Sequence, residues 1–184
     1  LEENDIPIDY ISGCSMGAVI GSIYASGTNL QLLEQLFCQM KSTDLYDYNL
    51  PMRGLVRGNR FQDVIRTLTK NKDFDELSIP FNCVACDIRA GITRILDTGK
   101  VHESVRASMS IPGIFEPVTL DGILYVDGVV MEPVPVNAAR TFGADIVIAV
   151  DVGMQSLYED IKETTWEILP RALDLLGQRA KMHE

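Results

Sequence analysis

The sequence predicts an α/β fold with three layers, in which helices cover both faces of a mainly parallel sheet. Strand-like and helix-like segments alternate along the chain, and glycines or prolines mark most of the boundaries between them. The 184 residues, 46% hydrophobic and 23% charged, suit one globular domain with a sizeable core. Because no repeat or linker divides the chain, we interpret residues 1–184 as a single domain.

The first predicted unit is a strand at residues 8–12 followed by a helix at residues 16–26. Small side chains in this helix permit close packing on the sheet. Gly27 is expected to end the helix, because glycine readily adopts the left-handed conformation found there. Thr28 and Gln31 have the spacing of a capping box, which predicts a second helix that runs to about residue 41.

The remaining elements are predicted from periodicity and from turn residues. They are a loop at 42–58, a helix at 59–71, strands at 81–88 and 92–97, a short helix at 101–109, a proline-rich loop at 110–118, a hairpin turn at 121–122, a strand ending at 127, a helix at 136–142, a strand at 145–151 and a helical tail at 155–184.

A serine lies between two glycines at the first strand–helix junction, in the stretch Gly13-Cys14-Ser15-Met16-Gly17. This pattern is typical of a nucleophile elbow, a turn so tight that only hydrogen side chains fit on either side of the serine. The elbow would expose the Ser15 hydroxyl at the end of a strand. The backbone N–H of Met16 and the positive end of the helix would then face an oxyanion. The alternative is a glycine-rich turn that serves only close packing.

A serine hydroxyl needs a base to become a good nucleophile. Of the two histidines, His183 is one residue from the chain end, and His102 lies in a short helix beside an acidic residue. Asp127 is better placed, because it ends a predicted strand and Gly128 gives its backbone freedom. Asp87, Asp97 and Asp151 also end predicted strands and have structural interpretations as caps or turn formers.

The formal net charge of −10 argues against a nucleic-acid partner and against attraction of the whole molecule to an anionic membrane. Any membrane contact must therefore be local. Cys83 and Cys86 fall in a predicted strand, where positions three apart point to opposite faces, so we expect no metal site there. Reduced cysteines fit a cytoplasmic location.

Three motifs resemble a bacterial patatin-like phospholipase close to the neuropathy-target-esterase branch. They are the elbow at residues 13–17, the block Arg-Ala-Ser-Met-Ser-Ile-Pro-Gly-Ile-Phe-Glu-Pro-Val at residues 106–118, and Tyr-Val-Asp-Gly at residues 125–128. The resemblance extends from residue 1 to about residue 153. It implies a patatin-like three-layer fold and a dyad of Ser15 as nucleophile and Asp127 as base. The implied reaction is hydrolysis of acyl-ester lipids through an acyl-serine intermediate, without metal or cofactor.

The sequence departs from the family pattern at two places. Val129 stands where the family's Asp-Gly motif usually continues with glycine or alanine. The family also has a glycine-rich oxyanion loop before the nucleophile strand, and residues 1–12 contain no such loop. We therefore expect the domain to be truncated at its N-terminus. Truncation at the C-terminus is a further alternative that stays open.

The segment at residues 52–61 mixes three arginines with apolar residues, which suggests a local contact with a lipid surface. The candidate contact residues are Arg53, Leu55, Val56 and Arg57. An ordinary solvated loop is the alternative for this segment. For the whole chain, two functions besides the dyad hydrolase stay open: a Ser-His-Asp α/β-hydrolase, and a lipid-binding homologue without catalysis.

Overall fold

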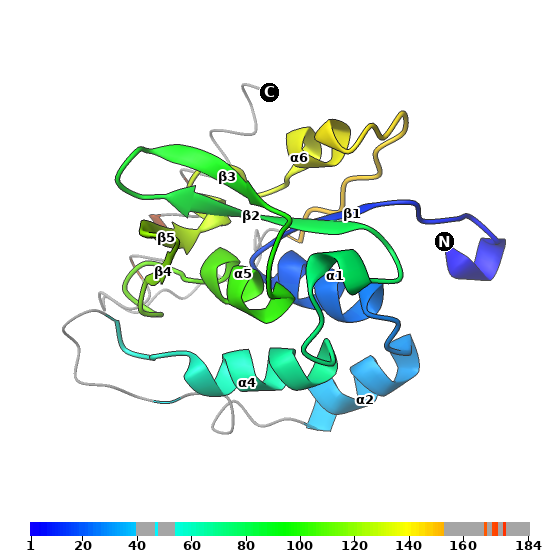
Figure 1. The fold of residues 1–184 in the computed structure, drawn as a ribbon, viewed down its shortest axis with the longest axis horizontal. Helices are drawn as coiled ribbons and strands as arrows, with labels where there is room; N and C mark the ends of the chain where they lie inside the picture. The colour runs from blue at the N-terminus through cyan, green and yellow to red at the C-terminus, as the bar shows by residue number, and fades with distance from the viewer. Residues whose placement is uncertain (40–46, 48–53, 153–167, 169–170, 173–174, 176–184) are drawn as a thin grey trace.

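The computed structural model describes residues 1–39, 47, 54–152, 168, 171–172 and 175. Strands and helices alternate around one sheet (Figure 1). The strands are β1 (Ile11–Cys14), β2 (Phe81–Asp87), β3 (Ile92–Leu96), β4 (Val118–Leu120) and β5 (Ile123–Asp127). The α-helices are α1 (Met16–Ala25), α2 (Leu30–Gln39), α4 (Asn59–Leu68), α5 (Val101–Ser108) and α6 (Val136–Thr141). Short 3-10 helices lie at Glu2–Asn4, Phe74–Glu76 and Gly128–Val130.

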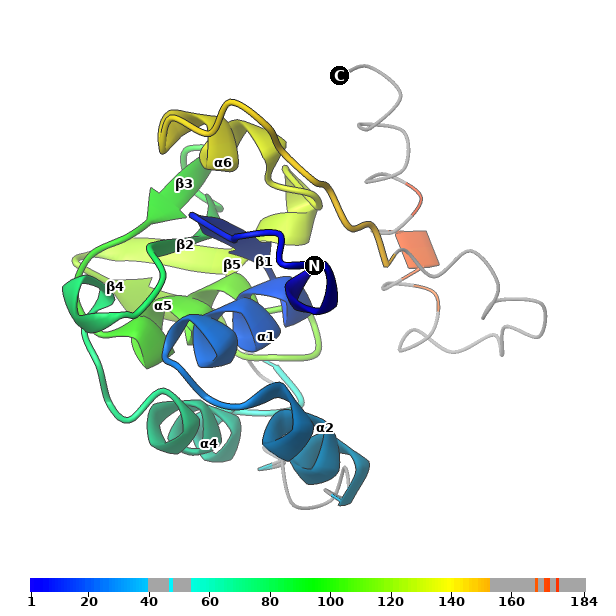
Figure 2. The same cartoon turned by 90° about the vertical axis from the view of Figure 1, so that its right-hand side faces the viewer.

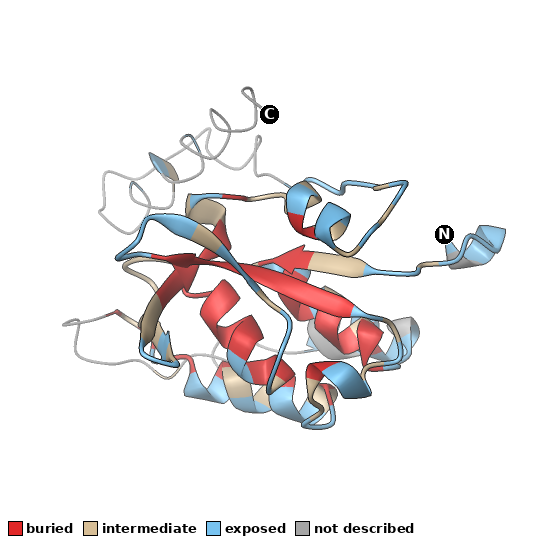
Figure 3. Cartoon of the chain, turned by 45° about the horizontal axis from the view of Figure 1, so that its top comes forward, coloured by how far each residue is buried: buried red, intermediate tan, exposed pale blue. Residues whose placement is uncertain are grey.

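The sheet is mixed, and β2 is its central strand. β1 pairs with β2 in parallel, whereas β3 and β5 pair with β2 in the antiparallel sense, and β4 pairs antiparallel with β5. Two of the antiparallel pairs, β2–β3 and β4–β5, are hairpins, in which the strands must run in opposite directions. Every residue of β2 is buried (Figure 3), as expected for a strand with packing on both faces.

Strands β1 and β5 share one edge of β2. β3 occupies the other edge, because it pairs with β2 residues 83–87, which include the positions that β1 and β5 also pair. β1 runs parallel to β2 and ends with Cys14 opposite Val84, while β5 runs the opposite way and ends with Asp127 opposite Ala85. The carboxyl ends of the two strands therefore meet at neighbouring residues of β2.

Helices cover both faces of the sheet. α1 and α5 pack on one face and α6 packs on the other, against β1 and β2 (Figure 1). α4 lies beneath α5 and α1 as an outer layer, with α2 beside it (Figure 2). The largest apolar cluster fills the space between the sheet and these lower helices. Its fully or nearly buried members include Val19, Ile23, Ile65, Val101 and Val105.

Several helix and turn predictions are confirmed. α1 ends at Ala25, followed by Gly27 with a φ of 78°. The hairpin turn at 121–122 has a positive φ at both central residues, 49° and 79°, as a type I′ turn requires. α4 ends at Leu68, three residues before the predicted end, because Lys70 and Asn71 both adopt a left-handed backbone.

The predicted capping box of α2 is wrong. The side chain of Asn29 caps this helix, because its Oδ1 accepts hydrogen bonds from the N–H groups of Gln31 and Leu32. The hydroxyl of Thr28 instead donates to the carbonyl oxygen of Leu68, 3.1 Å away. Thr28 therefore joins the start of α2 to the end of α4. The predicted end of this helix, about residue 41, lies outside the described residues.

The predicted strand at residues 145–151 is also wrong. No strand forms there in the structure, and the alternating apolar side chains of this region are exposed, with 85% for Ile146, 61% for Ile148 and 75% for Val150. Alternation indicates strand propensity, but a strand also needs a neighbour whose backbone it can pair with. Among the described residues, this segment has no such neighbour. Most of the predicted tail, residues 155–184, lies outside the described residues.

Candidate active site

Ser15 occupies a strained turn between β1 and α1. Its φ of 53° and ψ of −119° are uncommon for a residue with a side chain, and such strain concentrates at functional sites. A Cβ added to Gly13 would lie 2.6 Å from the backbone N and Cα of Ala18, so glycine is required before the turn. A Cβ at Gly17 would meet nothing within 4 Å. The expected steric restriction is therefore confirmed for Gly13 and wrong for Gly17.

The Ser15 hydroxyl donates a hydrogen bond to Asp127, with 2.6 Å between Oγ and Oδ2. Ser15 is half-buried, whereas Asp127 is fully buried at the end of β5. Ser15 also stands at the N-cap position of α1, where a serine would usually accept a bond from the helix, but no side-chain capping bond forms. The hydroxyl is thus directed at the carboxylate and away from the helix.

The second carboxylate oxygen of Asp127 is fixed by two other donors. Oδ1 accepts a bond from the backbone N–H of Val129 at 2.9 Å, and the Cys14 thiol lies 3.8 Å away. Burial, followed by the charge of Asp127, raises the pKa of the Cys14 thiol, which keeps it protonated as a donor. The valine at the third motif position therefore leaves this hydrogen bond intact.

Burial also raises the pKa of Asp127, to about 6, against the opposing effect of its hydrogen bonds from Ser15, Val129 and Cys14. At neutral pH this carboxylate is ionised and more basic than an ordinary aspartate. A base with a pKa close to the working pH combines a high ionised fraction with a strong driving force for accepting a proton. Asp127 therefore has the position and the basicity that a proton acceptor for Ser15 needs.

Gly128 allows the chain to pass close to β2 directly after the carboxylate. A Cβ at this position would lie 2.6 Å from the carbonyl oxygen of Val84 and 2.9 Å from the sulfur of Cys14. Any larger residue would push β5 away from the strand end that carries Ser15. This close approach is the physical reason for the glycine that follows Asp127.

Two serines that the sequence analysis did not single out connect both site residues to the end of α5. Ser108 Oγ accepts a hydrogen bond from the backbone N–H of Ser15 at 3.0 Å and donates one to the carbonyl oxygen of Val84 at 2.7 Å. The carbonyl oxygen of Ser110 accepts from the backbone N–H of Asp127 at 2.9 Å. Both serines belong to the block at 106–118, but only the tertiary structure places them at the site.

Arg106 holds the loop that follows α5. Its guanidinium is almost fully buried, lies 5.3 Å from the centre of the Phe115 ring, and donates to Ser110 Oγ at 2.7 Å and to the carbonyl oxygen of Glu116 at 2.9 Å. It also donates to the carbonyl oxygen of Arg57. One side chain thus joins the end of α5 to two loops, which fixes the segment that carries Ser108 and Ser110.

The histidines do not provide a base for Ser15 in the described part of the chain. His102 is buried in the first turn of α5, where its Nδ1 lies 3.1 Å from Nε2 of Gln62 on α4. Ser108, which contacts the Ser15 backbone, is at the opposite end of the same helix. His183 lies outside the described residues.

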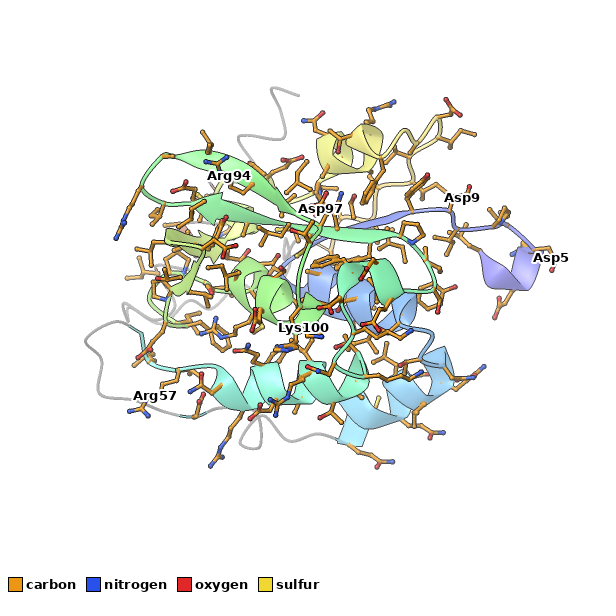
Figure 4. The ribbon with its side chains drawn as sticks, viewed as in Figure 1. Asp5, Asp9, Arg57, Arg94, Asp97 and Lys100 are labelled. Carbon is orange, nitrogen blue, oxygen red and sulfur yellow. The ribbon has the colours of Figure 1, made fainter. Side chains whose placement is uncertain are left out.

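The predicted lipid-contact residues do not share one surface. Val56 is 3% exposed and bonded through its backbone to Ile114 and Glu116, so its prediction as a surface contact is wrong. Leu55 is partly buried against the core, whereas the side chain of Arg57 is exposed and points outward (Figure 4). Arg53 lies outside the described residues.

Met16, whose backbone N–H is the predicted oxyanion donor, begins α1 directly after Ser15, and its side chain is half exposed.

Within the part of the chain that the structure describes, every helix is too short or too polar to span a bilayer.

Comparison with known proteins places the chain in a family. Residues 1–140 match the family model described as patatin-like phospholipase. Patatin-like phospholipase domain-containing protein 7 of Mus musculus is 33% identical over 163 residues, which cover 83% of this chain and 12% of the mouse protein. The human patatin-like phospholipase domain-containing protein 6 is 30% identical over an alignment of length 184, which covers 93% of this chain and 13% of the human protein.

A bacterial relative is similar to a comparable degree. An uncharacterized NTE family protein of Mycobacterium tuberculosis is 31% identical over 154 residues, which cover 83% of this chain and 43% of that protein. The chain therefore spans less than half the length of these relatives. The match to the family model confirms the predicted resemblance and the three-layer α/β/α fold class, and this chain belongs to the patatin-like phospholipase family.

Proposed function

We propose that the protein is a lipid acyl hydrolase in which Ser15 is the nucleophile and Asp127 is the base. The observation that carries the proposal is the 2.6 Å hydrogen bond from Ser15 Oγ to Asp127 Oδ2. The strained backbone of Ser15 and the raised pKa of Asp127 support the same roles. Membership of the patatin-like phospholipase family supports acyl-ester lipids as the substrate class.

The proposed reaction has two stages. Asp127 takes the proton of Ser15 Oγ as this oxygen bonds to the ester carbonyl carbon, and the alcohol leaves with the proton from Asp127. Water then attacks the acyl-serine and gives a proton to Asp127, which returns it to Ser15 as the fatty acid leaves. The negative charge that forms on the carbonyl oxygen in each stage lies near the N–H of Met16 at the start of α1. No metal or diffusible cofactor takes part in these steps.

A covalent label tests the nucleophile. In the protein with its natural termini, a long-chain alkyl fluorophosphonate should modify Ser15, identified by mass spectrometry of the labelled peptide. Ser15→Ala should remove the labelling and the hydrolysis of acyl esters. Ser22→Ala is the matched control, because Ser22 is fully buried within α1 and its hydroxyl donates to the carbonyl oxygen of Val19. Labelling that persists in Ser15→Ala would refute the proposal.

We also propose that Arg57 contacts lipid headgroups at the membrane surface, where the protein would bind peripherally. Its exposed cationic side chain lies in a chain with a net charge of −10, so any attraction to anionic lipid must be local. Arg57→Ala should reduce co-sedimentation with vesicles that contain anionic lipid and leave hydrolysis of a dispersed short-chain ester unchanged. Equal sedimentation of Arg57→Ala and the natural sequence would contradict the proposed lipid contact.

A further inference from the structure

We propose that Ser108 is a positioning residue for the nucleophile: its hydroxyl holds the backbone of Ser15 in the strained conformation that directs Oγ at Asp127. This inference rests on the proposed function. It adds a role for a side chain that has no contact with the reacting atoms.

The hydrogen bonds of Ser108 have only one possible direction. The carbonyl oxygen of Val84 can only accept a hydrogen bond, so the Ser108 hydroxyl is the donor, with 2.7 Å between the two oxygen atoms. The backbone N–H of Ser15 can only donate, so it bonds to a lone pair of Ser108 Oγ, 3.0 Å away. Because donation to Val84 increases the electron density on Oγ, it strengthens the bond from Ser15. One hydroxyl thus links the elbow to the central strand.

The position of this link suits the strain of the elbow. Ser15 has a φ of 53°, a conformation that persists only when the surroundings fix it. Val84, the other partner of Ser108, lies opposite Cys14 in the register of β1 and β2. Ser108 therefore binds the turn to β2 at the level where β1 ends. With the Ser15 N–H directed at Ser108, the next amide, that of Met16, is left to face the oxyanion.

The same short segment also holds the base. The carbonyl oxygen of Ser110 accepts the backbone N–H of Asp127, and Arg106 binds the Ser110 side chain. The backbones of both dyad residues are thus bonded to residues 108–110 at the end of α5. A shift of Ser15 relative to this segment would lengthen the bond between Ser15 Oγ and Asp127 Oδ2.

A direct chemical role for Ser108 does not fit its surroundings. Its side chain is fully buried, with an exposed fraction of 0%, so a substrate cannot reach it. Its only proton is committed to Val84. Its removal should therefore affect the rate constant of the chemical step and leave substrate binding almost unchanged.

Ser108→Ala in the protein with its natural termini tests the inference, with Ser22→Ala as the matched control for loss of a fully buried hydroxyl. We expect kcat and the rate of fluorophosphonate labelling to fall about 10- to 100-fold in Ser108→Ala, because small displacements of reacting groups have effects of this size. KM should change less than about twofold. Ser22→Ala should retain the kcat and the labelling rate of the natural sequence.

The pH profile separates positioning from a general loss of stability. The bond from Ser15 lowers the pKa of Asp127 from the value that burial alone would give. If Ser108→Ala weakens that bond, the acidic limb of the profile of kcat/KM should move to higher pH. Ser22→Ala should leave this limb in place. A destabilised but correctly arranged site would lose active protein at every pH without this displacement.

For Ser108→Ala, either of two outcomes would overturn the inference. One is a kcat of Ser108→Ala within twofold of that of the natural sequence, and the other is a reduced kcat with an unmoved acidic limb. If Ser108→Ala does not fold, Ser108→Cys replaces it, because a thiol is similar in size and hydrogen-bonds weakly; full kcat in that variant would also overturn the inference. Labelling that survives Ser15→Ala would instead refute the proposed function, so the two failures are distinguishable.

Discussion

The Ser15 hydroxyl donates a hydrogen bond to Asp127, with 2.6 Å between the two oxygen atoms, although the two residues are 112 positions apart in the chain. They meet because β1 and β5 run toward each other along one edge of β2 and end opposite Val84 and Ala85. The separation of the two side chains is therefore set by the register of three strands.

Replacement of Asp127 by Asn should lower kcat/KM for acyl-ester hydrolysis by about 10²- to 10⁴-fold, the usual loss when a general base is removed. The amide has nearly the same shape as the carboxylate but cannot accept the proton of Ser15. The rate of fluorophosphonate labelling should fall with the hydrolysis rate. His102→Ala, which removes a histidine at the far end of α5, should retain most of the activity. An equal loss in His102→Ala would favour a histidine-dependent mechanism.

The activity should rise with pH through the pKa of Asp127, which is about 6. Only the ionised carboxylate can accept a proton, so kcat/KM should be low near pH 5 and level off above pH 7. The profile should be measured with a neutral ester, whose own ionisation cannot contribute. Full activity at pH 4.5 would show that the base has a much lower pKa or that another group acts.

Asp127→Asn should raise the free energy of unfolding above pH 6. The pKa of Asp127 is near 3.8 as a free group and about 6 in the folded protein, so between these values the folded state binds a proton that the unfolded state has released. Stability contributed by this group therefore decreases as the pH rises from about 4 to 6 and stays reduced above 6. This pKa difference of about two units corresponds to a loss of at most about 3 kcal/mol in the free energy of unfolding.

Urea denaturation at several pH values checks this effect. The difference in unfolding free energy between Asp127→Asn and the natural sequence should be largest above pH 7 and shrink as the pH falls toward 4. A difference that is independent of pH would show that burial of the charge is not its source.

Gly13→Ala and Gly17→Ala should change stability in opposite directions. A methyl group at position 13 would lie 2.6 Å from the backbone of Ala18, so we expect a loss of about 1–3 kcal/mol or more from overpacking. A methyl group at position 17 meets nothing within 4 Å, and alanine favours the helix by up to about 1 kcal/mol over glycine. Thermal unfolding of both variants measures the contrast. Equal destabilisation would show that both glycines are sterically required.

Arg106→Lys should destabilise the protein by about 1–3 kcal/mol, because an ammonium group cannot replace the several hydrogen bonds of a buried guanidinium. Arg94→Lys is the control, since the Arg94 side chain is 45% exposed and lies 3.7 Å from Asp87 in its ion pair. That variant should stay within about 0.5 kcal/mol of the natural sequence. Similar free energies of unfolding for the two lysine variants would contradict the structural role of Arg106.

Most helices and strands could be predicted from the sequence, because their signals are local. The apolar run at residues 81–88 indicated the buried strand β2, and the aspartate-glycine pair at 121–122 indicated the hairpin turn. The errors arose where a local pattern depends on a distant partner. Thr28 matched a capping box but bonds to Leu68, and residues 145–151 alternated like a strand without a described neighbour to pair with.

The elbow around Ser15 and the motif around Asp127 could be recognised from the sequence, since a strand, a tight turn and a helix are specified by residues close together in the chain. The contact between these two residues, the burial that makes Asp127 more basic, and the hydrogen bond from Ser15 to Ser108 arise from the packing of the whole domain. Distance, burial and hydrogen-bond partners depend on how β1, β5 and α5 pack against β2. These quantities cannot be derived from the spacing of residues along the chain, because they arise only when strands far apart in sequence share one sheet.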